Sequence, residues 1–419
     1  MTMRIGVLLI FARSACLAAA CGYTDYTPPH DTKRLIGLRN NYQWYRAGSV
    51  EQAQLDKEAR LLFAGVTKRS NCGLPAFLTW YPVPKLPAPS RERAGSTGPK
   101  IQFERTSLLN ETERTLLETT GPVYTTVLVN RASHRHMLRK NLVDRAAFSR
   151  MVGSGDRGIP DFPEEAVTVK AIWRVVKQGQ SLKLGMWRPE YAVGKSSFPE
   201  NDWPTYTYVD SRNGAQGKPQ CVPADGIPHG GHIDPSYFLS VPVTSEMDFE
   251  VLSRDGPKPV PGDELILVGL HISTKQIPDW LWLTAWWSGQ YRAEPNPLEA
   301  PRCNYAMSIT LSMTTPRKEV EQPPDFNAQF NPYLEAAFRN GLYSNCMTCH
   351  VAAAYCNQFP DSHSSGESVY VSVLEQLLRT DFVWSVGRRL GDTPSACYHS
   401  GNSPRSATPT SPSHRAPPP

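Results

Sequence analysis

Prolines divide this chain into short segments, and no other feature limits its possible folds as strongly. The 419 residues include 38 prolines, many of which lie between apolar runs. Proline interrupts both a helix interior and a central strand, so it marks turns and the ends of elements. We therefore predict short strands and loops rather than long helices. The length predicts roughly two or three packed units.

Three apolar runs in the middle of the chain predict strands. Residues 166–176 alternate between apolar and polar side chains, which is typical of a half-buried strand. Residues 264–272 are apolar on both faces, as in a strand buried between two layers, and residues 303–313 form a third run. Glycine and proline clusters separate these runs, which favours an antiparallel sandwich or barrel-like arrangement.

Helices are expected before these strands. Residues 49–66 place apolar side chains on one helical face, and Ser49 with Gln52 forms a capping box. Residues 110–119 and 135–152 are the other helices predicted in the first half of the chain.

Another helix is expected after residue 330, where Asn331 is a cap, Pro332 occupies the first helical position and Gly341 ends the helix. The fold class is thus predicted to be α+β, with a strand-rich, sandwich-like region, flanking helices and a small helical C-terminal domain. The expected divisions are a signal peptide at 1–20, a mixed helical region at 21–155, a strand-rich domain at 156–320, a helical domain at 321–400 and a disordered tail at 401–419.

The first residues resemble a secretory signal peptide. Arg4 gives a short positive region, residues 5–12 are apolar, and small residues precede Cys21. Arg13 interrupts the apolar stretch, which leaves an uncleaved N-terminal helix or an inaccurate start site as the alternative. The run LAAAC resembles a bacterial lipobox, although its Leu17 lies four residues before the cysteine, so Cys21 is a candidate lipid-anchor site. No other stretch has the roughly 18 to 20 apolar residues that span a bilayer.

The charge distribution argues against a nucleic-acid partner. The formal net charge is +5, but four of the arginines lie in the predicted leader and tail, so the rest of the chain is nearly neutral. We find no basic stripe interleaved with aromatic residues. The phosphate-loop, GxSxG and HExxH motifs are also absent, so the sequence gives no support for the hydrolase and nucleotide-binding classes that carry them.

The stretch NCMTCH, residues 345–350, carries the clearest chemistry. Cys346 and Cys349 are separated by two residues and His350 follows, which is the Cys-x-x-Cys-His pattern of c-type heme attachment. Two thiols on adjacent helical turns can add to the two vinyl groups of heme as thioethers, and the next residue then presents its imidazole to the iron. We therefore predict one covalently attached heme c, with His350 as the proximal iron ligand.

On these residues the C-terminal part of the chain resembles a c-type cytochrome with a single heme. The longer layout is similar to that of large exported bacterial mono-heme proteins, in which segments such as LVGLHISTK and DWLWLTAWW precede a late CxxCH and a DFVWS-like stretch. The second resemblance implies no activity. We expect a redox partner protein and a periplasmic or otherwise exported location.

The second axial ligand of the iron is the open question. Small c-type cytochromes usually take a methionine from downstream of the motif, whereas no methionine follows Met347 here. The candidates lie upstream: His271 in the predicted buried strand, and Met307, with Met313, in the next strand. A hydrogen-bonded core histidine and packed core methionines are the alternative interpretations. His229 and His232 are a further candidate metal or heme site, with a solvent-exposed loop as the plainer interpretation. The histidines expected at the surface are His134, His136, His363 and His399.

Three functional interpretations remain open. In the first, the iron is six-coordinate and the protein transfers electrons. In the second, the distal position is open and the protein is a heme enzyme or a gas sensor. In the third, the cysteines form a disulfide, or a zinc site with His350 and Cys356, in a secreted binding module.

The tryptophan-rich stretch at 278–287 would be the ligand face of such a module, or the wall of a heme pocket, and an aromatic-rich core is the plainer interpretation. Connectivity among the other cysteines cannot be assigned from the sequence alone; these are Cys72, Cys221, Cys303, Cys356 and Cys397.

Overall fold

The computed structural model describes most of the middle of the chain. The described residues are 22–29, 35, 50–83, 101–105, 121–195, 197–211, 217–250, 257–289, 298–311, 329–338, 341–343, 345–350, 353–355, 377–383 and 386. The expected signal peptide, helix 110–119 and tail lie outside these residues, as do Cys21, Met313, Cys356, Cys397, His363 and His399. Among the residues described, no helix combines the length and apolar character needed to cross a bilayer.

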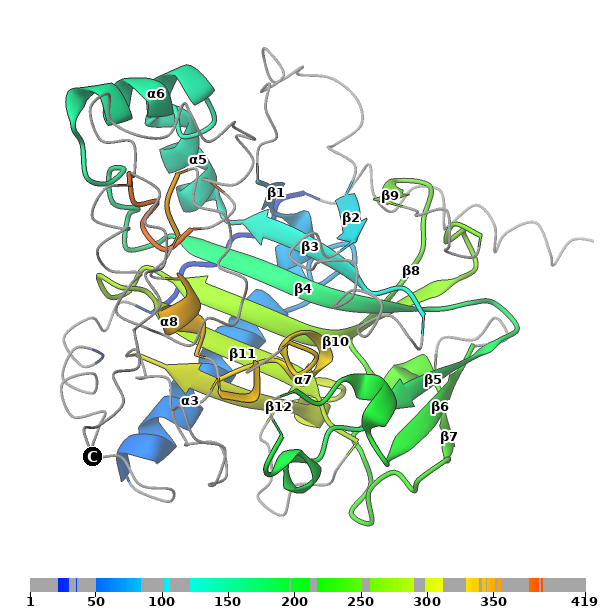
Figure 1. Cartoon of the computed structure of the whole chain (residues 1–419). Coiled ribbons are helices and arrows are strands. Elements are labelled where there is room, and N and C mark those ends of the chain that lie inside the picture. Colours follow the sequence, from blue (N-terminus) through cyan, green and yellow to red (C-terminus); the bar gives the residue numbers. More distant parts are fainter. Residues whose placement is uncertain are drawn as a thin grey trace, which may run out of the picture.

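One nine-stranded sheet organises the fold (Figure 1). Its order is β12-β11-β10-β4-β3-β2-β9, with β1 paired to β3 and β8 paired to β10. The strands are β1 Tyr81–Pro82, β2 Ile101–Arg105, β3 Tyr124–Val129, β4 Val167–Val176, β8 Ser240–Pro242, β9 Met247–Phe249, β10 Glu264–Thr274, β11 Leu281–Trp287 and β12 Tyr305–Thr310. Only β2 and β9 pair in parallel, so the sheet is mostly antiparallel. The predicted strand-rich region with flanking helices is confirmed.

β10 is the central strand, as its apolar run predicted. It pairs with β4 on one side and with β11 and β8 on the other. Most of its side chains are buried, including all of those from Leu265 to Leu270. Its pairing with β4 shifts register between Leu267 and Gly269. This irregularity precedes the part of the strand that lies near the CxxCH motif.

The two faces of the sheet differ in chemistry. Residues paired across neighbouring strands share a face, and successive residues alternate. Leu270, Ala285 and Met307 form one row, and this face is covered by the helix α3, Val50–Val66, whose Phe63 ring contacts Tyr305 at 5.2 Å. We call it the α3 face.

The opposite face carries polar side chains and the motif. His271, Thr284 and Ser308 form its central row. Two short helices lie on this face, α7 at Pro332–Glu335 and α8 at Cys346–His350 (Figure 1). We call it the α8 face.

The helices agree with the sequence in part. The helix predicted at 49–66 is confirmed as α3. The helical prediction at 135–152 is confirmed in part, because two helices cover most of this range, α5 at Arg131–Arg139 and α6 at Arg145–Ser154, with a break between them. The first helix ends at Arg139 with Lys140 as its C-cap. Asp144 caps the second, its carboxylate accepting a hydrogen bond from Ala146 N at 3.0 Å.

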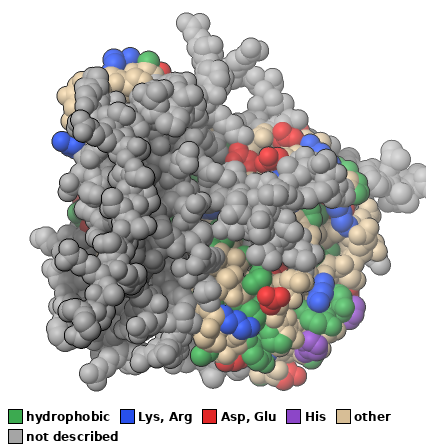
Figure 2. Space-filling view, in the orientation of Figure 1, with side chains coloured by type: hydrophobic (Ala, Val, Ile, Leu, Met, Phe, Trp, Pro, Cys, Tyr) green, Lys and Arg blue, Asp and Glu red, His purple; other side chains and the backbone are tan. Residues whose placement is uncertain are grey.

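A smaller sheet and several 3₁₀ turns complete the described fold. β5 at Ser181–Gly185, β6 at Tyr206–Asp210 and β7 at His232–Ile233 form a three-stranded sheet. Histidine side chains gather over it on the face shown in Figure 2, among hydrophobic and basic side chains. The 3₁₀ turns are η2 Ala76–Thr79, η3 Pro189–Ala192, η4 Glu200–Asp202, η5 Pro235–Tyr237, η6 Arg302–Asn304 and η7 Gly341–Tyr343.

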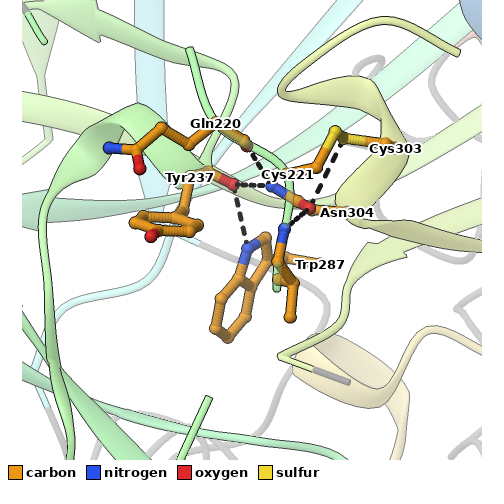
Figure 3. The surroundings of a disulfide bond; sticks show 7 residues. Gln220, Cys221, Tyr237, Trp287, Cys303 and Asn304 are labelled. Atoms are coloured by element: carbon orange, nitrogen blue, oxygen red, sulfur yellow. Dashed lines mark hydrogen bonds between the residues drawn. A yellow bond between two sulfur atoms is a disulfide. The ribbon is translucent and has the colours of Figure 1, made fainter. Parts of the chain in front are cut away.

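A disulfide joins Cys221 to Cys303 at the start of β12 (Figure 3). Beside it, the Asn304 side chain donates to the carbonyl oxygens of Gln220 and Tyr237 at 2.8 Å each. The same Asn304 accepts from Val222 N at 2.7 Å. This network fixes the loop after residue 217 against the sheet. Cys72 is also disulfide-bonded.

We predict that Cys221→Ala combined with Cys303→Ala lowers the free energy of unfolding by about 4 kcal/mol. The cross-link spans 82 residues, and closing a loop of that length reduces the entropy of the unfolded chain by about this amount. Urea denaturation of the wild type and the double variant measures the change. An unaltered free energy of unfolding would show that the cross-link does not restrict the unfolded chain in this way.

Candidate functional site

The CxxCH motif begins a helix because Asn345 caps it. The Asn345 side-chain oxygen accepts a hydrogen bond from Met347 N at 2.9 Å, and its backbone oxygen accepts from Cys349 N at 3.0 Å. The Asn345 amide group also reaches Thr310 Oγ1 at 3.3 Å. The helix that presents the cysteines and His350 is therefore attached to the end of β12.

Gln329 provides a second attachment of the motif to the sheet. Its side chain donates to the carbonyl oxygens of Trp282 at 3.0 Å and Ser308 at 2.6 Å. The backbone carbonyl oxygen of Gln329 lies 3.7 Å from Cys346 Sγ. Residues 329 and 345 also form an isolated bridge. Together these contacts hold α8 against β11 and β12.

Both motif cysteines are free thiols. Burial raises the pKa of Cys349 to about 12, and that of Cys346 well above its ordinary value; the nearby Glu335 carboxylate adds to both shifts. A thiol with a raised pKa stays protonated and is a poor nucleophile. The electrostatics therefore argue against a catalytic thiolate and leave two protonated thiols side by side on one short helix.

His350 is oriented by a backbone carbonyl. Its Nδ1 lies 2.7 Å from the oxygen of Phe382, and its ring centroid is 4.3 Å from that of Trp282. Burial lowers the pKa of His350 to about 4, so the ring is neutral at pH 7 and its proton is on Nδ1, which donates. Nε2 then carries the free lone pair, and it makes no hydrogen bond within the described residues.

The Phe382 carbonyl is presented by a constrained turn. Asp381 and Phe382 both have positive φ, 47° and 64°, a conformation that non-glycine residues adopt at a cost. The Asp381 carboxylate holds the turn by accepting from Lys275 Nζ at 2.5 Å and Phe162 N at 3.1 Å. The described start of the DFVWS-like stretch, residues 381–383, therefore lies against the motif histidine.

A second imidazole lies on the same face of the sheet. His271 Nε2 is 3.6 Å from Glu335 Oε1, and this buried nitrogen has no hydrogen-bond partner. Burial lowers the pKa of His271 to about 3, and the positive charge of Lys170 and the nearby His350 add to the shift. Lys170 is the residue opposite His271 on β4. His271 is therefore neutral at physiological pH.

Glu335 reaches this position because α7 lies directly on the sheet. The α7 cap, Asn331, donates from its side chain to Thr284 Oγ1 at 3.1 Å and Ala285 O at 2.9 Å. A Cβ at Gly269 would lie 2.7 Å from the Asn331 amide atoms, so the close approach requires glycine. The Glu335 carboxylate accepts from Asn331 N, and burial raises the pKa of Glu335 to about 7.

The other candidate residues lie elsewhere. Met307 is on the α3 face, opposite Ala285, and packs against the core. His229 and His232 are exposed, as expected. The expectation that His136 is a surface residue was wrong: it is buried, with Nε2 3.1 Å from Pro160 O. His134 stacks on Tyr81 with ring centroids 4.1 Å apart.

Three parts of the site were missed by sequence reasoning. Glu335 is a carboxylate within the predicted helix after Asn331, and Lys170 is a polar residue in an alternating strand, so each had an ordinary surface interpretation. The third part is the Phe382 carbonyl, a backbone group with no signature of its own. Trp282, from the tryptophan-rich stretch, is buried in a hydrophobic cluster, as the aromatic-core interpretation expects, and its ring centroid lies 4.3 Å from that of His350.

The residues present fit a covalently attached heme. Two free thiols have the spacing that thioether attachment needs, and His350 has one nitrogen fixed and the other available. His271 offers a second buried nitrogen without a partner. Within the described ranges, no group of three or more histidine, cysteine or acidic side chains is placed to hold a metal ion by itself.

Comparison of the chain with protein-family models, with curated proteins and with solved structures finds no match. The interpretation of this site therefore depends on the geometry and chemistry of the residues described above.

We predict that Gly269→Ala displaces Asn331 and lowers the free energy of unfolding by about 1–3 kcal/mol, the usual cost of an extra methyl group in a packed core. Gly153→Ala is the matched control, because this α6 glycine has nothing within 4 Å of an added Cβ and should be neutral or stabilising by about 0.5–1 kcal/mol. Urea denaturation of both variants provides the comparison. Equal effects of the two substitutions would contradict the close approach of Asn331.

The raised pKa of Glu335 predicts a pH-dependent stability. In the unfolded chain Glu335 loses its proton near the ordinary pKa of about 4.5, whereas in the folded chain it keeps the proton up to about pH 7. Between these pH values the unfolded state is therefore favoured, and Glu335 lowers the free energy of unfolding as pH rises. Glu335→Gln, made in the heme-free Cys346→Ala/Cys349→Ala chain, removes the cost. The variant should gain stability over its parent progressively between these pH values in urea titrations, and a constant difference would refute the buried-acid assignment.

Proposed function

We propose that this chain is an exported c-type cytochrome with one heme, attached through Cys346 and Cys349, that transfers electrons. The observation that carries the proposal is the hydrogen bond between His350 Nδ1 and Phe382 O. Histidines that bind a metal usually donate their other ring nitrogen to a carbonyl or carboxylate, which fixes the ring and raises its basicity. The histidine of a CxxCH motif with this arrangement is prepared to bind iron through Nε2.

In this proposal, residues 321–400 form the heme-bearing unit, and the helices described within it, α7 and α8, lie on the α8 face of the sheet. Cys346 and Cys349 would anchor the group and His350 would hold the iron, while Trp282 packs against the His350 ring. The heme supplies one-electron chemistry when bound. The chain contributes the axial ligand, its hydrogen bond to Phe382 and the burial of the site, which are the factors that set a heme reduction potential.

An exported location is supported by the cysteine chemistry. The Cys221–Cys303 disulfide belongs to a class of cross-link that persists in oxidising compartments outside the cytoplasm. The signal-like first residues agree with export, and Cys21 is the proposed lipid-anchor position if the chain is a lipoprotein. A soluble or membrane-bound redox protein would be the partner that delivers or removes the electron.

A heme enzyme or gas sensor is the second candidate. It is favoured by the polar groups beside the motif, Lys170, His271 and Glu335, which could act on a small molecule bound at an open iron. The two candidates share the covalent heme and differ in whether a side chain occupies the distal position.

We predict that Cys346→Ala combined with Cys349→Ala abolishes covalent heme attachment. The full-length chain, expressed with a c-heme maturation system, should keep its heme absorption after denaturation, because thioether bonds survive unfolding. Met347→Leu is the matched control: this side chain lies inside the motif but is buried in the core, so its replacement should leave the heme attached.

Denatured wild-type protein without a heme band would refute the cytochrome and the heme-enzyme proposals together. Zinc in the purified native protein, at one ion per chain and lost in the Cys346→Ala/Cys349→Ala variant, would then favour the secreted zinc module.

A further inference from the structure

The strand register places His271 and His350 on the same side of the sheet. His271 is paired with Thr284 of β11, and Trp282 lies two residues from Thr284 along the same strand. Both therefore project from the α8 face, since side chains alternate along a strand. The Trp282 ring contacts the His350 ring at 4.3 Å between centroids, so the motif histidine lies over the face from which His271 projects.

The same register places Met307 on the other side. Met307 is paired with Ala285, the neighbour of Thr284, and so points toward the α3 face. It packs there against the hydrophobic core. From this side of the sheet, the Met307 side chain cannot reach an iron that His350 holds on the other side. Of the upstream candidates that the structure describes, His271 and Met307, His271 is the one that shares a face with the motif.

His271 has the free coordination capacity that a ligand needs. Its Nε2 is buried and makes no hydrogen bond. The nearest acidic oxygen, Glu335 Oε1, is 3.6 Å away, which exceeds hydrogen-bonding distance. Buried polar atoms almost always have a partner, and an exception indicates a functional role such as binding an ion. A metal ion in front of Nε2 would supply that partner.

The surrounding elements hold His271 in place. β10 is paired along both edges, with β4 and with β11, at His271 itself. Glu335 lies beside the ring because Asn331 fixes α7 over Gly269. Thus a central strand and a capped helix position the imidazole before any cofactor arrives, which is the rigidity expected of an axial ligand.

We propose that His271 is the distal ligand of the heme iron, so that His271 and His350 close the iron from both sides. This inference rests on the proposed heme attachment. Glu335, whose Oε1 lies 3.6 Å from His271 Nε2, would hold the imidazole in position. A closed iron leaves no position for a substrate or gas, which selects electron transfer over the heme-enzyme and sensor alternatives.

The test uses the full-length, heme-loaded protein. Near-infrared magnetic circular dichroism of the oxidised wild type should show the charge-transfer band of bis-histidine ligation, and the reduced protein should fail to bind carbon monoxide. His271→Ala should lose the low-spin spectrum and gain carbon monoxide binding. Free imidazole added to this variant should restore the low-spin spectrum, a result that a general folding defect would not give.

Two variants serve as controls. Met307→Leu should leave the spectrum unchanged, because this side chain lies on the α3 face. Lys170→Ala should also keep the bis-histidine band. If instead the wild type shows a band typical of amine ligation and Lys170→Ala loses the low-spin spectrum, the distal ligand is Lys170 and the inference is overturned.

The remaining outcomes distinguish a failure of the His271 assignment from a failure of the proposed heme attachment. A high-spin wild type that binds carbon monoxide, or a His271→Ala variant with the wild-type spectrum, would overturn the role of His271 and leave the heme attachment intact. If the denatured wild type carries no heme, the proposed function fails and the ligand assignment fails with it. If His271→Ala does not accumulate, the wild-type dichroism band and carbon monoxide test decide the ligation by themselves.

Discussion

The alternation of side chains across β10, β11 and β12 is the constraint on which the rest of this structure depends. One row of paired residues, Leu270, Ala285 and Met307, points to the α3 face. The next row, His271, Thr284 and Ser308, points to the α8 face. A slip of one residue would exchange the two faces, exposing the α3 core and turning His271 away from the motif. The same pairing that buries the core therefore decides which side chains meet the CxxCH helix.

The electrostatics of the site follow from burial. The imidazoles of His271 and His350 are kept neutral, the two motif thiols are kept protonated, and Glu335 has a raised pKa. For each of these groups the uncharged form is favoured, as expected where water is excluded. A neutral imidazole is the form that binds iron, and a thiol converted to a thioether has no charge to bury. Covalent heme would thus suit a site whose surroundings already disfavour charge.

Much of the fold could be predicted from the sequence because the pattern was local. The two-sided apolar run of β10, the alternation in β4 and the cap at Asn331 each identified an element. The division of 135–152 into two helices was missed because Asp144 caps a helix inside what appears as one periodic segment. The CxxCH motif was visible as a pattern, whereas its environment was not. The neighbours Trp282, Glu335 and Phe382 come from three separate segments, and the Phe382 group is a carbonyl that no side-chain pattern reports.

The choice between His271 and Met307 shows most clearly what could not be predicted from the sequence. In sequence both residues lie in apolar strands upstream of the motif, and nothing in either strand says which face will meet α8. Register supplies that information, because it is a property of pairing between strands. The role of Gly269, two residues before His271, is also visible only in the folded chain, where Asn331 lies against it.

The central claim, that heme is attached at Cys346 and Cys349, is tested most directly by mass spectrometry of the peptide that contains residues 345–350, taken from protein expressed with a c-heme maturation system. The account predicts a peptide whose mass includes one heme joined through both sulfur atoms, with His350 unmodified. A peptide with two free thiols, or with a disulfide between Cys346 and Cys349, would contradict it.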